Sequence, residues 1–538
     1  ILSFLSDILL STQSICFAVS LIGAIYVFCT WNNDYFLKRN IPYKKPAFLF
    51  GSFKGLIFKT QHLTELVQEL YDEFSHSKVY GYFEYLKPTY VIRDIDLIKK
   101  ITIKDFDHFI NHRVSFDEKI EPLFTKNLFS AKDLKWRNMR IVLSPAFTGS
   151  KMRLMFNLIS EYCNRAFDRM QKQDKSDTLD VEIKDLAGRL TMDIIASTAF
   201  GIENDSLVER DNDFIAYAKD IGDFSGLRGM ILLIANAFPA LSKFLKLRFF
   251  SERELTFFRN LVNTTVKYRE DNKILRHDML NLLIQARKKT LKYDELDKKY
   301  ESAGFATATE HNILDTKAYA SVEWDDDDVT AQCMVFFLGG YDTTSQLICF
   351  AIYELAINPD VQSKLREEID QVQSSLNGQL VNYEQLQTMK YMDMVVSETL
   401  RKWPAAVFLD RCCTKPYEIN DNGNIITLKP GDGLLIPVWA IQRDPKYYPN
   451  PEKFDPERFS EQNRKNFNLD AFLSFGIGPR NCIGSRFALM ESKAIIYNIM
   501  TRFYIEKSSK TVDPMVLDKT TIATVAKGGF WVQFRKRE

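Results

Sequence analysis

The chain has 538 residues, and its 71 basic and 70 acidic side chains give a formal net charge of +1. A charge this balanced does not favour a nucleic-acid-binding protein. Length alone would predict about three domains, but no linker, low-complexity tract or internal repeat interrupts the sequence after residue 52. We therefore expect one large, mainly helical unit that is long enough to enclose a cofactor and a substrate cavity.

The eight cysteines and six histidines form neither a disulfide framework nor a zinc site. The sequence has no CxxC pair, no HExxH and no Cys/His cluster, and two cysteines, Cys16 and Cys29, lie in an apolar N-terminal segment. This pattern favours reduced thiols in a cytosol-facing protein.

The N-terminal segment predicts a membrane anchor over residues 1–31. No charge occurs from Ile8 to Trp31, a run longer than the roughly 20 residues that span the hydrocarbon layer. Four basic residues follow within residues 38–45, and positive flanks stay in the cytosol. The alternatives are a buried core helix and a cleaved signal peptide, which the position of the basic residues disfavours. Residues 32–52, with Pro42 and Pro46, form a tether to a globular domain over 53–538.

The next informative pattern is a helical turn around Trp136. Trp136 and Arg140 share a helix face at i, i+4 spacing, and an arginine fork suits a carboxylate ligand. A surface stack of the two side chains is the alternative. Lys132, Lys135 and Arg137 beside them could present a basic surface to an acidic partner protein, or could be ordinary solvated side chains.

Two segments lie between this helix and the next strong motif. Residues 230–241 are apolar and are followed by Lys243, Lys246 and Arg248, which is typical of a second membrane contact. A core helix is the alternative. Residues 297–323 are polar and irregular, and we expect a surface loop there.

A long helix is predicted between Asp325 and Asn358. Four successive acids at residues 325–328 stabilise its N-terminus through the helix dipole, and Pro359 ends it. Gly339 and Gly340 in its middle cost roughly 2 kcal/mol relative to alanine, which requires a reason such as close approach of a flat cofactor. Asp342 and Thr343 follow, and an acid–alcohol pair there could relay protons. A kinked core helix is the alternative.

Two charged motifs precede the C-terminal region. Glu398 and Arg401 share a helix face at i, i+3 spacing, and Arg458 lies in Pro456-Glu457-Arg458-Phe459. Such pairs most often mark a solvated face.

The strongest motif is Phe475-Gly476-Ile477-Gly478-Pro479-Arg480-Asn481-Cys482-Ile483-Gly484. This glycine-bent loop brings Cys482 to the start of a helix, where backbone N–H groups and the positive helix end favour a thiolate. A cysteine thiolate is an axial ligand of haem iron that favours O–O cleavage. A structural cysteine after a glycine-rich turn is the alternative.

These motifs, in this order, resemble those of the cytochrome P450 monooxygenases over almost the whole chain. The resemblance is greatest to insect microsomal members of the clan that includes the drug-oxidising human enzymes, through residues 336–344 and 400–404. It implies a mainly α fold with small β-sheets and a haem b cofactor with Cys482 as its iron ligand.

The resemblance also assigns roles to individual residues. Asp342 and Thr343 would be catalytic, and Glu398, Arg401 and Arg458 would form a buried structural network. The residues expected to bind the cofactor are His112, Trp136, Arg140, Gly340, Arg411, Phe475, Arg480 and Cys482, several of them on the haem propionates. The residues expected to contact substrate are Phe116, Phe124, Phe336, Ala405, Val407, Phe408 and Ile522, an almost entirely apolar set.

The function implied is oxidation of hydrophobic small molecules, with xenobiotic detoxification favoured over biosynthesis of an endogenous lipid or steroid. A haem-thiolate isomerase or dehydratase is disfavoured because the acid–threonine pair is present, and a haem-binding sensor because the pocket is apolar. The sequence contains no flavin or dinucleotide motif, so electrons are expected from NADPH–cytochrome P450 reductase, with cytochrome b5 as a further donor. The expected location is the endoplasmic reticulum membrane, with the catalytic domain in the cytosol.

Overall fold

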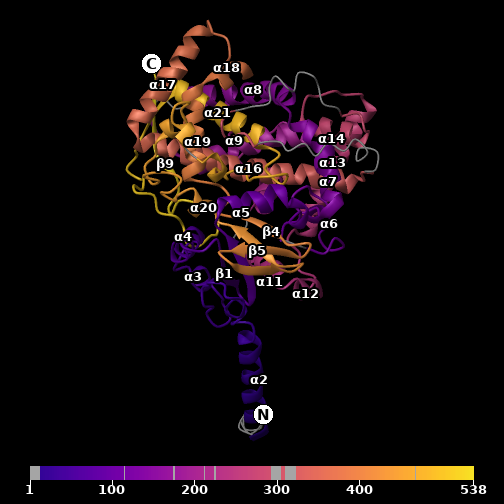
Figure 1. Cartoon of the computed structure of the whole chain (residues 1–538). Helices are drawn as coiled ribbons and strands as arrows, with labels where there is room; N and C mark the ends of the chain where they lie inside the picture. Colours follow the sequence, from indigo (N-terminus) through magenta and orange to yellow (C-terminus); the bar gives the residue numbers. More distant parts are fainter. Residues whose placement is uncertain are drawn as a thin grey trace, which may run out of the picture.

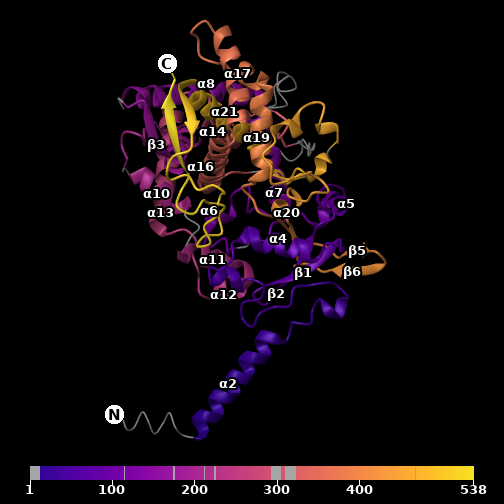
Figure 2. The same ribbon diagram turned by 90° about the vertical axis from the view of Figure 1, so that its left-hand side faces the viewer.

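The computed structural model describes residues 12–113, 116–173, 176–210, 213–222, 226–291, 304–308, 323–466 and 468–537. Its N-terminal helix α2 (Thr12–Thr30) projects from a large body, while the C-terminus lies at the opposite end (Figures 1 and 2). Apolar side chains of α2 such as Phe17, Ile22 and Phe28 are more than half exposed. With 19 residues, α2 is about 28 Å long.

Helices form most of the body. Those of the N-terminal half are α3 (Lys54–Ile57), α4 (Leu63–Glu73), α5 (Ile95–Lys99), α6 (Pro122–Thr125), α7 (Asp133–Leu143), α8 (Gly149–Gln173), α9 (Ile183–Ile195), α10 (Asp213–Gly222), α11 (Gly226–Ala237) and α12 (Pro239–Phe244). Those of the C-terminal half are α13 (Glu252–Asp271), α14 (Met279–Arg287), α16 (Asp326–Ile357), α17 (Pro359–Ser375), α18 (Tyr383–Thr388), α19 (Lys390–Lys402), α20 (Val438–Ile441) and α21 (Ser485–Arg502). Short 3-10 or π turns are η1 (Leu37–Arg39), η2 (Lys100–Lys104), η3 (Phe106–His108), η4 (Ser144–Phe147), η5 (Ala196–Phe200), η7 (Pro456–Phe459), η8 (Arg464–Asn466) and η9 (Leu469–Ala471).

The long helix α16 runs through the centre of the body and packs along α9, α13 and α21 (Figure 1). Asp325 caps its N-terminus by accepting from the Asp328 N–H, and Asp328 accepts in return from the Asp325 N–H. This reciprocal capping box satisfies two N–H groups that the first turn of a helix cannot bond internally. Of the described helices, only α16 is long and apolar enough to cross a membrane, but most of its apolar window is buried inside the protein.

The strands form three small sheets beside the helices. They are β1 (Val79–Glu84), β2 (Lys87–Ile92), β3 (Thr178–Glu182), β4 (Leu409–Cys412), β5 (Tyr417–Asp421), β6 (Asn424–Leu428), β7 (Gly433–Ile436), β8 (Phe503–Glu506) and β9 (Trp531–Lys536). The largest sheet has the order β1-β2-β7-β4. Only its β2–β7 pair is parallel, and β4 pairs antiparallel with β7 so that Arg411 lies opposite Leu434. The other sheets are β3-β9-β8 and β5-β6.

Three hydrophobic clusters stabilise this arrangement. The largest joins the helices around α16, including Phe147, Phe337 and Phe487, and a second lies beneath the four-stranded sheet. The mainly helical fold class with small sheets is therefore confirmed. The predicted division at residues 31 and 52 remains a prediction.

Candidate active site

The loop from Phe475 to Gly484 holds Cys482 in a defined position. Gly476 and Gly478 have φ angles of +75° and +79°, a region that favours glycine. A Cβ on Gly478 would lie 2.0 Å from the Thr102 carbonyl oxygen, so only glycine fits there. The Cys482 N–H donates to the Phe475 carbonyl at 2.8 Å, and α21 begins three residues later at Ser485.

Cys482 faces an internal cavity of about 640 Å³. Its side chain keeps accessible surface, and that surface lies in the cavity wall rather than on the outside of the protein. Burial raises the pKa of the Cys482 thiol, whereas the Gly484 N–H and the charge of Arg140 act in the opposite direction. The Gly484 N–H at the helix start therefore favours the thiolate, in the predicted direction, while desolvation opposes it.

A cluster of cationic side chains lines one end of the same cavity. Arg140 comes from α7, Arg411 from β4 and Arg480 from the cysteine loop. Burial, with the neighbouring charges of Arg411 and Arg140, lowers the pKa of Arg480 to about 8. Burial also lowers the pKa of Arg411, and its Nε atom is buried with no hydrogen-bond partner among the described residues. This end of the cavity therefore favours an anionic ligand.

Other contacts hold these cations in place. Arg480 lies over the Trp136 ring at 4.1 Å and donates from Nε to the Ile110 carbonyl at 2.8 Å. Arg140 donates to the backbone and side-chain oxygens of Asn481 at 2.9 and 2.7 Å. Trp136 and Arg140 are thus buried parts of the site, and a surface stack is excluded.

Asp410 is a largely buried carboxylate of this region, with 16% of its side chain exposed, that the sequence analysis missed. It accepts from His112 Nδ1 at 2.7 Å and from the Arg113 N–H at 2.6 Å. Burial alone would raise the pKa of Asp410, but His112 and the Arg113 N–H hold it below its usual range. Asp410 therefore fixes the His112 ring, which stacks on Phe129 at 4.4 Å. No sequence spacing links residues 112 and 410, so only the fold could show this pair.

The middle of α16 forms the opposite wall of the cavity through Phe336, Gly340, Thr343 and Leu347, which share one helix face by their i, i+4, i+7 and i+11 spacing. A Cβ on Gly339 would meet nothing within 4 Å, whereas one on Gly340 would lie 2.8 Å from Ile195 Cδ1 on α9. A side chain at position 340 would therefore require the Ile195 side chain to shift, which shows how closely α16 packs against α9 there. The Thr343 hydroxyl donates to the Gly339 carbonyl.

Asp342 does not line that wall with Thr343, so the two members of the predicted acid–alcohol pair do not face the cavity together. Its Oδ1 atom lies 2.7 Å from Lys184 Nζ on α9, and Lys184 also donates to the Ser345 hydroxyl at 3.1 Å. Successive helix residues are about 100° apart, so Asp342 points toward α9 when Thr343 points into the cavity. Lys184 was not identified from the sequence because it is distant along the chain.

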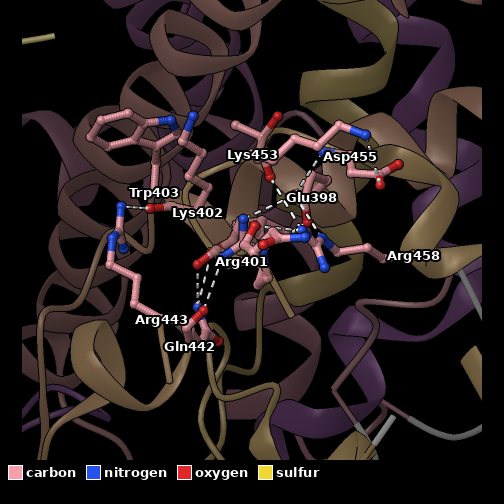
Figure 3. A network of polar contacts seen from close by, with 12 residues as sticks. Glu398, Arg401, Lys402, Trp403, Gln442, Arg443, Lys453, Asp455 and Arg458 are labelled. Carbon is pink, nitrogen blue, oxygen red and sulfur yellow. Dashed lines mark hydrogen bonds and ion pairs between the residues drawn. The ribbon is translucent and has the colours of Figure 1, made fainter. Parts of the chain in front are cut away.

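Behind the cysteine loop lies the network of Glu398, Arg401 and Arg458 (Figure 3). Arg401 donates to Glu398 through Nε at 2.8 Å and Nη2 at 2.9 Å, and Arg458 Nε lies 3.4 Å from Glu398 Oε1. All three side chains are buried. Arg401 also donates to the backbone carbonyl of Gln442. The side-chain Oε1 atom of Gln442 in turn accepts from the Leu473 N–H, in the segment that leads to the cysteine loop. A solvated face is therefore excluded.

The residues expected to contact substrate divide into two groups. Phe336, Ala405, Phe408 and Ile522 line the cavity, together with Leu232 of α11 and Met279 of α14, which the sequence analysis missed. Phe116, Phe124 and Val407 are not among the residues that line it, so their contact with substrate remains a prediction.

These three residues pack against other parts of the protein. The Phe116 and Phe124 rings pack on each other at 4.9 Å, and Phe124 packs on Phe249 at 5.5 Å. Val407 lies between Ala406 and Phe408 in a non-helical segment, and its carbonyl accepts from the Trp439 N–H. Its side chain is buried away from the cavity.

A cysteine presented to an apolar cavity, opposite a long helix and beside an arginine cluster, defines a haem-thiolate class of enzyme. Residues 41–532 match the family model described as Cytochrome P450, and the chain belongs to the cytochrome P450 family.

Similar proteins extend over almost the whole chain. It is 44% identical to Cytochrome P450 9e2 of Blattella germanica over 97% of both chains. It is 40% identical to Probable cytochrome P450 9f2 of Drosophila melanogaster, over 97% of this chain and 99% of that protein. With Cytochrome P450 6A1 of Musca domestica the identity is 35% over 95% of both chains. The predicted family and the resemblance to insect members are therefore confirmed.

The chain is accordingly a monooxygenase oxidoreductase with a haem-thiolate cofactor, a reductase as electron donor and hydrophobic substrates. The residues of the cavity fit that cofactor. All eight residues expected to bind it line the cavity. The unpartnered Nε of Arg411 and the lowered pKa of Arg480 suit carboxylates of the size and charge of haem propionates.

Proposed function

We propose that this enzyme oxidises apolar small molecules of diverse structure, as in xenobiotic detoxification. The single observation that carries the proposal is the cavity wall facing Cys482. Apart from the arginine end, it consists largely of apolar side chains contributed by several separate segments. Few fixed polar groups are available to select one substrate, and a pocket of this kind accepts ligands mainly through burial of apolar surface.

A substrate-binding difference-spectrum screen tests this proposal. Plant toxins, insecticides and steroids would be titrated into the purified haem protein. We expect several structurally unrelated apolar compounds to bind with comparable affinity. Tight binding of one steroid or lipid, with the other compounds silent, would contradict detoxification and support biosynthetic oxidation of an endogenous compound.

Each part of the site has a proposed task. Cys482 would bind the haem iron through its sulfur, and His112, Trp136, Arg140, Arg411 and Arg480 would hold the carboxylate end of the cofactor. The haem, when bound, supplies dioxygen activation. Thr343 provides a hydroxyl in the cavity wall, and Asp342 exchanges protons between the Lys184 side of α16 and the cavity. Asp342 must leave Lys184 to do so, because their 2.7 Å contact holds its carboxylate on the far side.

The proton path gives a direct prediction for variants of α16. Thr343→Ala should uncouple the reaction, so that NADPH is still consumed while product falls and hydrogen peroxide rises. Asp342→Asn should slow turnover by roughly 10²-fold, at the low end of general acid–base contributions. Ser345→Ala is the matched control, because this hydroxyl lies on the Lys184 side and donates to the Asp342 carbonyl. Product formed per NADPH and the rate of product formation are the measurements, and unchanged coupling and turnover in both test variants would contradict the proposed path.

We propose that α2 anchors the enzyme in the endoplasmic reticulum membrane with the body in the cytosol. Its exposed apolar side chains support this location. Figures 1 and 2 place α11 and α12 at the end of the body from which α2 projects. Met230, Leu241, Phe244 and Leu245 are exposed there, which supports a second contact with lipid.

Deletion of residues 1–31 should therefore weaken membrane attachment without preventing haem incorporation. Some attachment to liposomes should remain through the exposed side chains of α12. Adding Phe244→Glu to the deletion should release the protein, since 81% of this side chain is exposed and available to lipid. The bound fraction is measured by liposome flotation. A deletion variant that is already fully soluble would rule out the second contact.

We propose that the reductase, with cytochrome b5 as a further donor, docks near α7 on a surface that includes Lys132 and Lys135. The charge available there is smaller than the sequence suggests. Lys135 lies 3.5 Å from Glu118, and Arg137 forms an ion pair of 2.5 Å with Asp107.

A further inference from the structure

A short segment between α14 and α16 lies among the elements that hold the cysteine loop. We define it as the strap, residues Gly304 to Ala308. The sequence predicts a surface loop over 297–323, and most of that range lies outside the described residues. The strap does not fit the expectation, because Ala306 is 3% exposed and belongs to the main hydrophobic cluster.

The strap is not needed to join its two neighbouring helices. Arg287 at the end of α14 donates to Asp326 at the start of α16 at 3.0 Å, so the two helix ends lie side by side. A few residues would connect them. The sequence between the two helices, residues 288–325, is longer than this short distance requires. The packed strap shows that part of this connection has a defined place.

The first contact of the strap is a buried ion pair between α19 and α21. Lys493 Nζ lies 2.9 Å from Asp393 Oδ1, and the Phe305 N–H donates to Asp393 Oδ2 at 2.9 Å. A Cβ on Gly304 would lie 1.8 Å from Asp393 Oδ1 and 2.8 Å from Lys493 Nζ, and the φ angle of Gly304 is +127°. Only glycine brings the backbone this close to the pair.

The second contact is aromatic and joins the two segments that precede the cysteine loop. The Phe305 ring lies 4.8 Å from Phe459 and 5.3 Å from Phe472, and those two rings are 5.7 Å apart. Phe459 follows Arg458 of the buried network, and Phe472 precedes Phe475, the first residue of the loop. Edge-to-face and tilted pairs at these distances are favourable.

The third contact reaches the helix that begins directly after Cys482. The Ala308 N–H donates to the Ser485 hydroxyl at 3.2 Å, and Ser485 is the first residue of α21. One five-residue segment therefore contacts α19, the turn that contains Phe459, Phe472 just before the cysteine loop, and the first residue of α21 just after it.

We propose that the strap is a positioning element for the Cys482 loop. It fixes the two ends of the loop relative to α19 and limits access of water to the cysteine side of the haem. Phe305 and Gly304 are positioning residues, because they act through Phe472 and Asp393 rather than on the haem. The inference rests on the proposed role of Cys482 as the iron ligand.

The test uses the full-length haem protein with Phe305→Ala and, separately, Gly304→Ala. Release of the strap should admit water beside the thiolate, which stabilises the extra negative charge of the reduced site. We expect the equilibrium constant for reduction to rise roughly 3- to 10-fold. This raises the reduction potential of the haem protein by about 30–60 mV, at 59 mV per tenfold change. The thiolate Soret band of the reduced carbon monoxide complex should also be lost faster on warming.

Matched variants separate positioning from general stability. Phe305→Tyr keeps the ring and should restore wild-type values. Phe257→Ala removes a half-buried ring that stacks on Tyr217 at 4.6 Å, on helices away from the cysteine loop. It should lower thermal stability without changing the potential.

Three results would overturn the inference. One is that the reduction potential and the lifetime of the thiolate Soret band in both strap variants match those of Phe257→Ala. Another is a change only in the KM for the reductase, which would make the strap a docking surface. The third is failure of Phe305→Tyr to restore either value. Absence of the thiolate band from the wild-type protein would instead refute the role of Cys482.

Discussion

Replacement of Cys482 by alanine should abolish both turnover and the thiolate signature of the reduced carbon monoxide complex. The loop presents this sulfur to the cavity, and no other cysteine lines that cavity among the described residues. Burial raises the pKa of the free thiol, whereas coordination to a metal cation would lower it and keep the sulfur deprotonated. Without the sulfur, no strong electron-donating ligand remains on that side.

The control for this variant is Cys349→Ala. Cys349 is fully buried in α16 and does not line the cavity. It should keep the strongly red-shifted Soret band even if its stability falls. A Cys482→Ala protein that retained the band would show that another residue binds the iron.

Breaking the Glu398–Arg401 pair should have the largest effect on stability. Both side chains are 0% exposed, and removal of Arg401 leaves the buried Glu398 carboxylate with only the longer 3.4 Å contact to Arg458 as a counter-charge. Arg401→Met should therefore destabilise the protein by about 3–5 kcal/mol. The same change frees the Gln442 carbonyl that Arg401 holds, so haem content should fall as well.

Urea unfolding followed by haem release measures this effect. The control is Lys390→Ala, at the start of the helix that carries Glu398 and Arg401. It removes an exposed ion pair with Glu461 and should leave haem content unchanged. Equal losses in the two variants would contradict a special role for the buried pair.

The sequence was informative wherever one local motif decides the geometry. The glycines at 476 and 478 predict a tight loop before a helix, and the acids at 325–328 predict the start of α16. Local spacing also brought Trp136 and Arg140 to one helix face.

The rest depended on contacts between distant segments. The direction of Asp342 is set by Lys184, more than 150 residues earlier. The position of the Phe116 ring is likewise set by its packing against Phe124 and Phe249. The strap contacts α19 and α21 through backbone groups, which no side-chain pattern in its polar surroundings indicates. Burial of Glu398 and Arg401 likewise follows from tertiary packing, because the same i, i+3 pair is usually solvent-exposed.

Oxygen transfer with isotopically labelled dioxygen tests the central claim most directly. The purified full-length chain, its reductase and NADPH would be supplied with a compound that binds in the cavity. The account predicts one labelled oxygen atom in the product, with one NADPH consumed for each product in the coupled reaction. Product formed from a peroxide substrate without NADPH, or product oxygen derived from water, would contradict it and would indicate an isomerase or dehydratase instead.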